Sequence, residues 1–365
     1  MVTTFLTVRK CSRVHDDGHT GGTQPIVAQR ALRLYAARRV RIHEQEEYAH
    51  RSGERAGMVT VGVVGLGDMG GGMVERLLDA GASVHGWNRT AAKAAPFAQR
   101  GMHVAASPRA LAEAVELVIV MVTDNDALEA VFEGDDGILA GIRPGMIVAE
   151  MSTTSPTLVR ELGERVAARG ATLLDAPVSG SIQTLREGNL LIMVGGDRAA
   201  FERVESTLLA IGPRVRHIGE LGQAKALKLA ANLQLAVQTL AFSEGVLLAE
   251  KMGVDRRVAV ETLLHSAIAS PQLQYRARFI VDPPDHAWFT PKMMQKDVQL
   301  ALDLGREVGV PLPTSATTQE LLTAARSMGF AHEDFAVVFH ALAAMAGIAR
   351  DPASVPEYAR DAVTA

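Results

Sequence analysis

A glycine-rich segment is the first part of the chain whose residue types and spacing suit a chemical task. Gly65, Gly67 and Gly70 form the pattern G-x-G-x-x-G between a β-branched run and a helix-like stretch. The first glycine permits a tight turn, the second lets backbone approach a pyrophosphate, and the third lets helix and strand pack closely. Phosphates then bind the free amides of the helix N-terminus. We expect a dinucleotide site rather than a merely structural turn, with contacts from Gly65, Leu66, Gly67, Asp68, Met69 and Gly70.

The end of the next predicted strand bears on which dinucleotide binds. An NAD site usually places an acid here to bind the ribose 2′-hydroxyl. This chain has Asn88, Arg89 and Thr90 instead, with Lys93 in the following helix. Because a guanidinium binds phosphate through paired, charge-assisted hydrogen bonds, these residues favour NADP, with NAD as the alternative. The non-functional alternative for Arg89 is a solvated arginine at a strand end.

A helix-like stretch in the second half of the chain carries two lysines. Lys228 and Asn232 are four residues apart and therefore share a helix face, and Lys225 lies three residues earlier. Hydride reduction of a carbonyl leaves an alkoxide, which needs a proton donor within hydrogen-bond reach. A lysine desolvated in a cleft can have its pKa lowered enough to fill that role in both directions. Without further information, a surface lysine on an amphipathic helix remains the alternative.

The elements that must position these residues follow a regular order. Apolar runs that end at turn residues predict buried parallel strands. The predicted strands are 59–65, 83–88, 115–122, 146–152, 171–178 and 190–196, with helical stretches between them. After about Gly222 the strand patterns cease, and helical patterns cover 225–252, 300–308 and 335–346. This order predicts an α/β, Rossmann-like, doubly wound sheet followed by an all-α C-terminal domain joined by a long helix.

The predicted domains are an extension, two folded domains and a tail. They cover residues 1–57, 58–221, 222–350 and 351–365, in that order. The extension has three interpretations: a disordered segment, a weak nucleic-acid or targeting segment, or a stretch upstream of the functional start. The first and third are favoured, because the extension lacks lysine and aromatic clusters. We therefore predict that a protein starting at Met58 folds and is active.

Bulk composition excludes several classes of protein. The net charge of −4 and pI of about 6.3 indicate no general attraction to nucleic acid or to an anionic membrane. A single cysteine, Cys11, cannot form an internal disulfide, which fits a reducing cytoplasm. No run is long and apolar enough to cross a bilayer, so a soluble cytoplasmic protein is expected. The histidines are scattered and no Cys/His pattern indicates a metal site.

Four separated segments together resemble one enzyme family. They are GLGDMGGGM (65–73), MSTTSP (151–156), DAPVSGS (175–181) and GQAKALKLAAN (222–232). In this combination and order they resemble the β-hydroxyacid dehydrogenases, which include 3-hydroxyisobutyrate dehydrogenases, tartronate semialdehyde reductases and glyoxylate/succinic semialdehyde reductases. The resemblance runs from Met58 to about Arg350.

The resemblance implies roles for particular residues. The family's catalytic lysine precedes an asparagine by one helical turn, which selects Lys228 and Asn232 as catalytic. Lys225 is then expected near the helix start, solvated or touching a phosphate. The other implied roles are substrate binding by Thr153, Ser179, Gly180, Phe289 and Asp297, and cofactor binding by Thr153, Val122, Thr123 and Lys296.

The implied activity is hydride transfer between NADP(H) and a small 3-hydroxy acid or semialdehyde carboxylate, in a homodimer or homotetramer. The alternatives are an imine reductase and a non-catalytic NADP-binding module. The relative 6-phosphogluconate dehydrogenase carries a His-Asn pair where this chain has Ala231 and Asn232. Which hydroxy acid or semialdehyde is the substrate stays open, because Ile182, Gln183 and Thr184 match neither of the two most similar branches.

Overall fold

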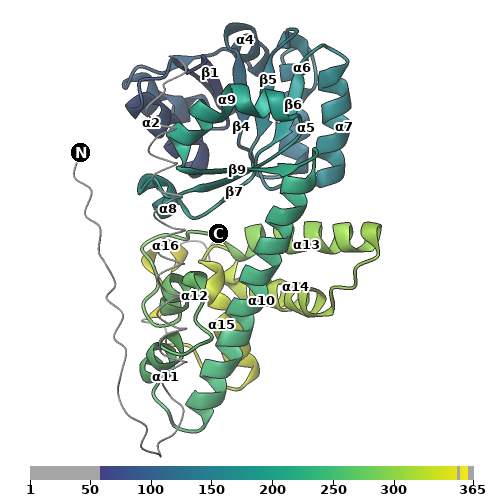
Figure 1. Ribbon diagram of the computed structural model, residues 1–365. Coiled ribbons are helices and arrows are strands. Elements are labelled where there is room, and N and C mark those ends of the chain that lie inside the picture. The colour runs from purple at the N-terminus through teal and green to yellow at the C-terminus, as the bar shows by residue number, and fades with distance from the viewer. Residues whose placement is uncertain (1–57, 352–353, 361–365) are drawn as a thin grey trace, which may run out of the picture. The chain divides into compact units, whose positions relative to one another are not determined.

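Apolar runs form the strands of one mixed sheet (Figure 1). This computed structural model of the protein describes residues 58–351 and 354–360, and in that part the sheet has nine strands. They are β1 Val61–Val64, β2 Val84–Trp87, β3 His103–Val104, β4 Leu117–Val120, β5 Ile147–Glu150, β6 Thr172–Asp175, β7 Val178–Ser179, β8 Leu191–Gly195 and β9 Arg214–Gly219. The order is β3-β2-β1-β4-β5-β6-β8-β7, with β9 paired to β8. All pairs are parallel except β6–β8 and β7–β8.

Helices cover both faces of the sheet. Successive strand residues point to opposite faces, so Val63 and Ile119 pack in one apolar cluster and Val64 and Val120 in another. The first cluster contains side chains of α2, α8 and α9, and the second contains side chains of α4, α5, α6 and α7. The helical segments of this region are α2 Asp68–Asp79, η1 Ala91–Ala94, α3 Ala95–Ala98, α4 Pro108–Ala114, α5 Asn125–Phe132, α6 Ile138–Gly141, α7 Pro156–Ala167, α8 Ile182–Arg186 and α9 Arg198–Ile211.

The second half of the described chain is helical and begins with the long helix α10, Gln223–Lys251. The remaining segments are α11 Arg256–Leu264, α12 Pro271–Arg276, η2 Ala277–Ile280, α13 Pro291–Val308, α14 Pro313–Ala325, η3 Arg326–Phe330, η4 Phe335–Val337, α15 Val338–Met345 and α16 Glu357–Arg360. Side chains of α10 pack against α11, α12 and α15 in one cluster and against α13 and α14 in another. The predicted fold class, a Rossmann-like sheet followed by a helical domain with a long first helix, is confirmed.

Several element boundaries differ from the sequence prediction. The predicted strand 171–178 is divided at Ala176 and Pro177, and the following β7 continues along β8 in the antiparallel register that Asp175 of β6 begins. Proline has no backbone N–H to donate to the sheet. Strand β9 was not predicted, since it lies at the sheet edge and alternates exposed and half-buried residues instead of forming an apolar run. Helix α13 begins nine residues before the predicted start at Leu300, with Pro291 at its first position and Thr290 as its cap.

The predicted domain boundaries are not settled by these elements. Strand β9 ends at Gly219 and α10 begins at Gln223, but the described residues belong to one compact unit. The extension 1–57, with Cys11, lies outside the described residues. In the predicted tail 351–365, α16 forms a helical turn in which Ala359 is buried. None of the helices in residues 58–351 and 354–360 is long and apolar enough to cross a membrane.

Candidate functional site

The glycine turn after β1 is shaped by contacts that exclude side chains at two of its three glycines. Gly65 has φ +98°, and a Cβ there would lie 2.1 Å from the carbonyl oxygen of Met121. A Cβ at Gly70 would lie 1.9 Å from the carbonyl oxygen of Gly65. At Gly67, by contrast, a Cβ would meet nothing within 4 Å. Open space at the second glycine and close packing at the third fit a turn that admits a pyrophosphate at the start of α2.

The end of β2 supports this turn and presents a free cation. The Asn88 side chain accepts a hydrogen bond from the Leu66 amide at 2.9 Å and donates one to the Thr90 carbonyl at 3.0 Å. Asn88 therefore ties the end of β2 to the glycine turn. Arg89 and Thr90 are exposed, and the Arg89 guanidinium has no hydrogen bond or ion pair within the described part of the chain. Arg89 is free to bind a phosphate.

A pocket of about 320 Å³ opens beside the glycine turn. It is lined by Leu66, Gly67, Asp68, Gly71, Gly72, Glu75, Lys93, Pro96, Phe97, Ile182 and Arg186. Its volume is in the range of small-molecule sites, and it begins at the residues that the glycine pattern assigns to the cofactor. The residues present thus fit a dinucleotide.

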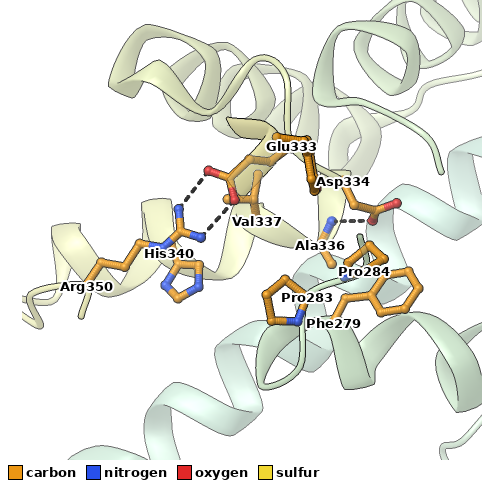
Figure 2. A pocket seen from close by; sticks show the side chains of 10 residues that line it. Phe279, Pro283, Pro284, Glu333, Asp334, Ala336, Val337, His340 and Arg350 are labelled. Carbon is orange, nitrogen blue, oxygen red and sulfur yellow. Dashed lines mark hydrogen bonds and ion pairs between the residues drawn. The ribbon is translucent and has the colours of Figure 1, made fainter. Parts of the chain in front are cut away.

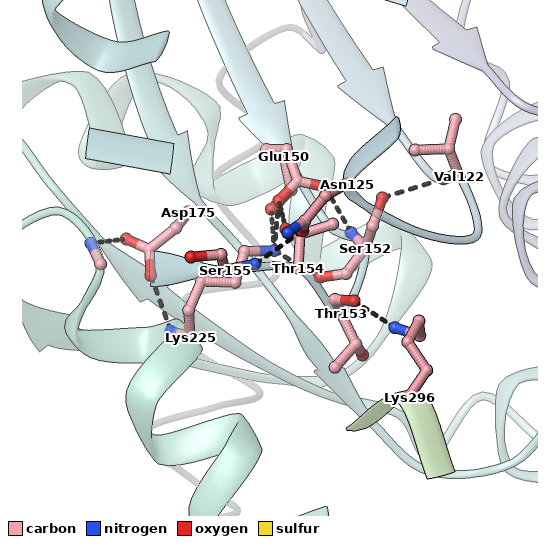
Figure 3. A network of polar contacts seen from close by, with 11 residues as sticks. Val122, Asn125, Glu150, Ser152, Thr153, Thr154, Ser155, Asp175, Lys225 and Lys296 are labelled. Carbon is pink, nitrogen blue, oxygen red and sulfur yellow. Dashed lines mark hydrogen bonds and ion pairs between the residues drawn. The ribbon is translucent and has the colours of Figure 1, made fainter. Parts of the chain in front are cut away.

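The ends of β4 and β5 bring further predicted contacts together. The Val122 amide donates a hydrogen bond to the hydroxyl of Ser152 at 2.9 Å (Figure 3). Thr153 follows directly, and its carbonyl oxygen accepts a hydrogen bond from the Lys296 ammonium on α13. Thr123 is exposed at the same edge of the sheet. Thr153, Val122 and Lys296 are therefore close to one another, as their shared assignment requires.

The second and third turns of α10 hold Lys228 and Asn232 in a buried polar group with α13. The Asn232 amide donates a hydrogen bond to Asp297 Oδ2 at 2.5 Å, and Lys296 Nζ lies 2.8 Å from Asp297 Oδ1. Lys228 is 9% exposed and Asn232 is 3% exposed. The carbonyl oxygen of the Asn232 side chain has no hydrogen-bond partner within the described residues. This group therefore retains an unsatisfied acceptor beside a lysine.

The pKa of Lys228 is shifted toward neutrality. Burial lowers it from 10.5 to about 8. The Asp297 carboxylate acts against this lowering, while the positive charges of Lys296 and Lys225 add to it. The ammonium of Lys228 makes no hydrogen bond or ion pair with any described residue. A lysine with this pKa and a free ammonium can donate and accept a proton near neutral pH.

Lys225 is buried, which corrects the prediction that it is solvated or touches a phosphate. It is 1% exposed, and its ammonium forms an ion pair with the carboxylate of Glu150, itself 0% exposed (Figure 3). The ammonium also donates to the carbonyl oxygens of Glu150, at 3.0 Å, and Ser152. Burial lowers the pKa of Lys225, and contact with Glu150 acts against that lowering. The prediction failed because Glu150, the partner, lies 75 residues away in the chain.

Asp175 anchors the start of α10. Its carboxylate accepts hydrogen bonds from the backbone amides of Gly222, at 2.9 Å, and Lys225, at 2.8 Å. Burial raises the pKa of Asp175, while the two amides and the charge of Lys225 act against that increase. The side chain thereby supplies acceptors for amides that the first helical turn leaves without partners.

The remaining predicted substrate residues lie at the edge of this group. Ser179 is half-buried in β7, and Gly180 follows it with φ +142°. Phe289 packs against a cluster that includes Leu235 and Ala236 of α10. In the described part of the chain, no hydrogen bond or ion pair joins any of these three predicted residues to Lys228. Their roles stay predictions.

A second pocket, in the helical region, does not fit a substrate (Figure 2). It is lined by Phe279, Pro283, Pro284, Glu333, Asp334, Ala336, Val337, His340, Arg350 and Tyr358. Its volume is about 10 Å³, the space of about one water molecule. Burial and the nearby Arg350 and Arg256 lower the pKa of His340 to about 3, so this histidine is neutral near pH 7. The pocket therefore lacks the room that a reducing site needs.

Sequence reasoning missed three residues that position the site: Glu150, Asp175 and Lys225. A detectable pattern existed. Two acids lie inside runs predicted to be buried strands, and a buried carboxylate requires a cation or several hydrogen-bond donors. The extra lysine one turn before Lys228 was available for that role.

Comparisons with known protein families agree with the geometry. Residues 60–219 match the NAD-binding domain of 6-phosphogluconate dehydrogenase. Residues 222–342 match the domain described as the NAD-binding domain of NADP-dependent 3-hydroxyisobutyrate dehydrogenase.

Individual proteins are similar over most of the described chain. The Arabidopsis thaliana glyoxylate/succinic semialdehyde reductase 2 is 32% identical over 80% of this chain and 81% of its own length. The cytokine-like nuclear factor N-PAC of Xenopus tropicalis is 34% identical over 77% of this chain, which spans about half (53%) of that protein. The crystal structure of a 3-hydroxyisobutyrate dehydrogenase from Salmonella typhimurium superposes with a TM-score of 0.71 at 29% identity, covering 77% of this chain and 99% of the enzyme.

Proposed function

The chain belongs to the β-hydroxyacid dehydrogenase family and is an NAD(P)-dependent oxidoreductase of that type, and from this premise we propose its reaction. It transfers a hydride between NADP(H) and a small 3-hydroxy acid or semialdehyde carboxylate, with Lys228 as the general acid and base. The observation that carries the proposal is Lys228 itself. It is a nearly buried lysine without a hydrogen-bond or ion-pair partner among the described residues, with a pKa near 8, on the same helix face as Asn232.

The roles of the residues follow from their contacts. The bound nicotinamide would supply the hydride to the substrate carbonyl carbon. Lys228 Nζ donates a proton to the oxygen that becomes the hydroxyl, and it accepts that proton in the reverse direction. Asp297 holds the Asn232 amide through its N–H donor. The free carbonyl oxygen of Asn232 then accepts a hydrogen bond from the Lys228 ammonium or from the substrate hydroxyl.

Binding is assigned to the predicted residues around this centre. The glycine turn 65–70 holds the pyrophosphate, and Val122, Thr123 and Lys296 border the cofactor. Arg89, with Thr90 and Lys93, binds the 2′-phosphate and favours NADP over NAD. Ser179 and Gly180 bind the substrate carboxylate, while Thr153, Phe289 and Asp297 border the substrate. The protein acts as a homodimer or homotetramer.

A non-enzymatic role is the second candidate, and one observation favours it. The nuclear factor N-PAC is as similar to this chain as the plant reductase is. Against this role stands the group of Lys228, Asn232 and Asp297, since a purely structural module has no need for a buried lysine that lacks a partner among the described residues. A buried cation of this kind costs stability, so its presence favours catalysis.

The test is a panel of small semialdehydes and 3-hydroxy acids, including glyoxylate, succinic semialdehyde and 3-hydroxyisobutyrate, assayed with NADPH and NADP. We expect turnover of at least one compound, and loss of that turnover in Lys228→Met with cofactor binding retained. Turnover of cyclic imines alone would replace the proposed substrate class by that of imine reductases. Binding of NADPH without turnover of any compound would support the second candidate.

A further inference from the structure

The ammonium of Lys225 connects the end of β5 to the first turn of α10 (Figure 3). It pairs with the Glu150 carboxylate and donates to the carbonyl oxygens of Glu150 and Ser152. A lysine ammonium has three N–H donors, and these three acceptors use all of them. Lys225 therefore has no donor left for a cofactor or a substrate, although it lies one turn from Lys228.

The contacts of Lys225 fix the residues on both sides of Thr153. Ser152, directly before it, offers its carbonyl oxygen to Lys225. Thr154, directly after it, donates its hydroxyl to Glu150 at 2.9 Å. The Glu150 carboxylate also accepts the Ser152 amide at 2.8 Å. Thr153 is thus held from both neighbours by one buried ion pair.

The contacts of Lys225 also fix the position of Lys228 on α10. The Lys225 amide is tied to Asp175 at the end of β6, and its ammonium is tied to the end of β5. A helix rises 1.5 Å per residue as a stiff unit, so fixing Lys225 at two strand ends fixes Lys228 as well. The position of the proton donor relative to Thr153 consequently depends on Lys225.

We propose that Lys225 is a positioning residue for the reaction: its buried contacts with Glu150 and Ser152 hold Thr153 and Lys228 in register, and it lies one helical turn before Lys228. The inference rests on the proposed function only in taking Lys228 as the proton donor.

The charge of Lys225 also acts on the pKa of Lys228, in a direction that can be stated. Asp297 and Lys296 on α13, and Lys225 on α10 itself, are the charged groups that act on Lys228. Glu150 faces Lys225 from β5 and Asp175 faces its amide from β6. Removing the charge of Lys225 takes away one of the two cations that lower the pKa of Lys228, so that pKa rises. In Lys225→Met alone the Glu150 charge is also uncovered, which raises it further.

The experiment measures the ionisation of Lys228 directly, without relying on turnover. Trace acetylation of Lys228 by acetic anhydride, read by mass spectrometry between pH 6 and 11, follows the neutral amine. Wild type should show a midpoint near the pKa of about 8. The charge-balanced variant Lys225→Met/Glu150→Gln should shift the midpoint upward by roughly half a pH unit or more. Lys225→Met should shift the midpoint further, and Lys225→Arg should restore the wild-type midpoint. The matched control is Lys251→Met, which removes an exposed lysine of the same helix.

Kinetics on the same variants test the positioning part. In the double variant kcat should fall roughly tenfold while the KM for NADPH changes little, because the glycine turn is untouched. An unchanged acetylation midpoint together with unchanged kcat in the folded double variant would overturn the inference. The two hypotheses fail separately. If the wild type reduces none of the carbonyls, the proposed function is refuted. A midpoint shift in the variants of that same protein would still show that Lys225 acts on Lys228. If Lys225→Met does not fold, the double variant, which buries no unpaired charge, decides.

Discussion

The first and second turns of α10 each bury a lysine, and the two side chains have opposite surroundings. Lys225, in the first turn, has a carboxylate and two carbonyl oxygens as partners. Lys228, in the second turn, has no hydrogen-bond or ion-pair partner within the described residues, and its pKa falls to about 8. Burial alone therefore does not distinguish a structural from a chemical lysine. The partners do, because a satisfied ammonium has no donor for a substrate.

The comparison is tested most strongly by the kinetic effect of removing each ammonium. Lys228→Met should lower kcat by roughly 10²–10⁴-fold, because the developing alkoxide loses its proton donor. NADPH affinity should change little, since the phosphates bind the glycine turn. Single-turnover rates and cofactor titration separate the two effects. A Lys228→Met enzyme with nearly normal turnover would assign the chemistry to another residue.

Stability should respond in opposite directions at the two positions. Lys225→Met leaves Glu150 buried without its cation, which should cost about 3–5 kcal/mol of unfolding free energy. Lys228→Met should instead stabilise the protein at pH 7 by about 1–3 kcal/mol, because a folded pKa below the unfolded one penalises the protonated lysine. That penalty is complete below about pH 8 and fades toward pH 10.5.

Urea unfolding at pH 7 and at pH 9.5 measures this contrast. The gain from Lys228→Met should shrink at the higher pH as the wild-type lysine loses its proton. Equal destabilisation by both substitutions would mean that Lys228 has a stabilising partner, and the distinction between the two turns would be lost.

Asn232→Ala tests whether Lys228, Asn232 and Asp297 work as a group. Asn232 is expected to orient the ammonium or the substrate without transferring a proton, so kcat should fall roughly 100-fold at most, the value of one hydrogen bond to a charged group. Asn232→Gln is the matched control, because it keeps both the N–H donor and the acceptor and should lose less than alanine. If alanine and glutamine are equally impaired, the position of the amide matters more than its presence.

The sequence predicted best those parts of the site that depend on residues close together in the chain. The glycine turn was predictable, since the residues that require it lie within six positions and their spacing reflects backbone geometry. Lys228 was assigned through the family resemblance, because its burial and the neighbouring charges of α13 arise only in the folded protein. The role of Lys225 was predicted wrongly. Nothing near it in the chain indicates Glu150, and only the folded sheet brings the two together.

Strands show the same dependence. The central strands β1, β4 and β5 are buried on both faces, so they are continuous apolar runs that can be read directly. The edge strand β9 has exposed arginines at alternate positions and depends on pairing with β8. The pairing of β9 with β8 arises only in the folded sheet, so the residues of β9 alone do not predict it.

Arg89 extends the comparison to an exposed cation that has no partner in the part of the chain that the structure describes, and the effect of its removal should be the smallest. If Arg89 binds the 2′-phosphate, Arg89→Ala should weaken NADPH binding roughly tenfold or more. The binding of NADH should be almost unchanged, because NADH lacks the 2′-phosphate. Lys93→Ala, at the neighbouring pocket wall, should have a milder effect of the same sign. The measurement is kcat/KM for both cofactors in wild type and both variants, at two salt concentrations, because an exposed charge pair is screened by ions. Equal kcat/KM with the two cofactors in wild type, or an unchanged NADPH/NADH ratio of kcat/KM in Arg89→Ala, would show that Arg89 is only solvated. A cation without a partner would then indicate a ligand only where the cation is buried.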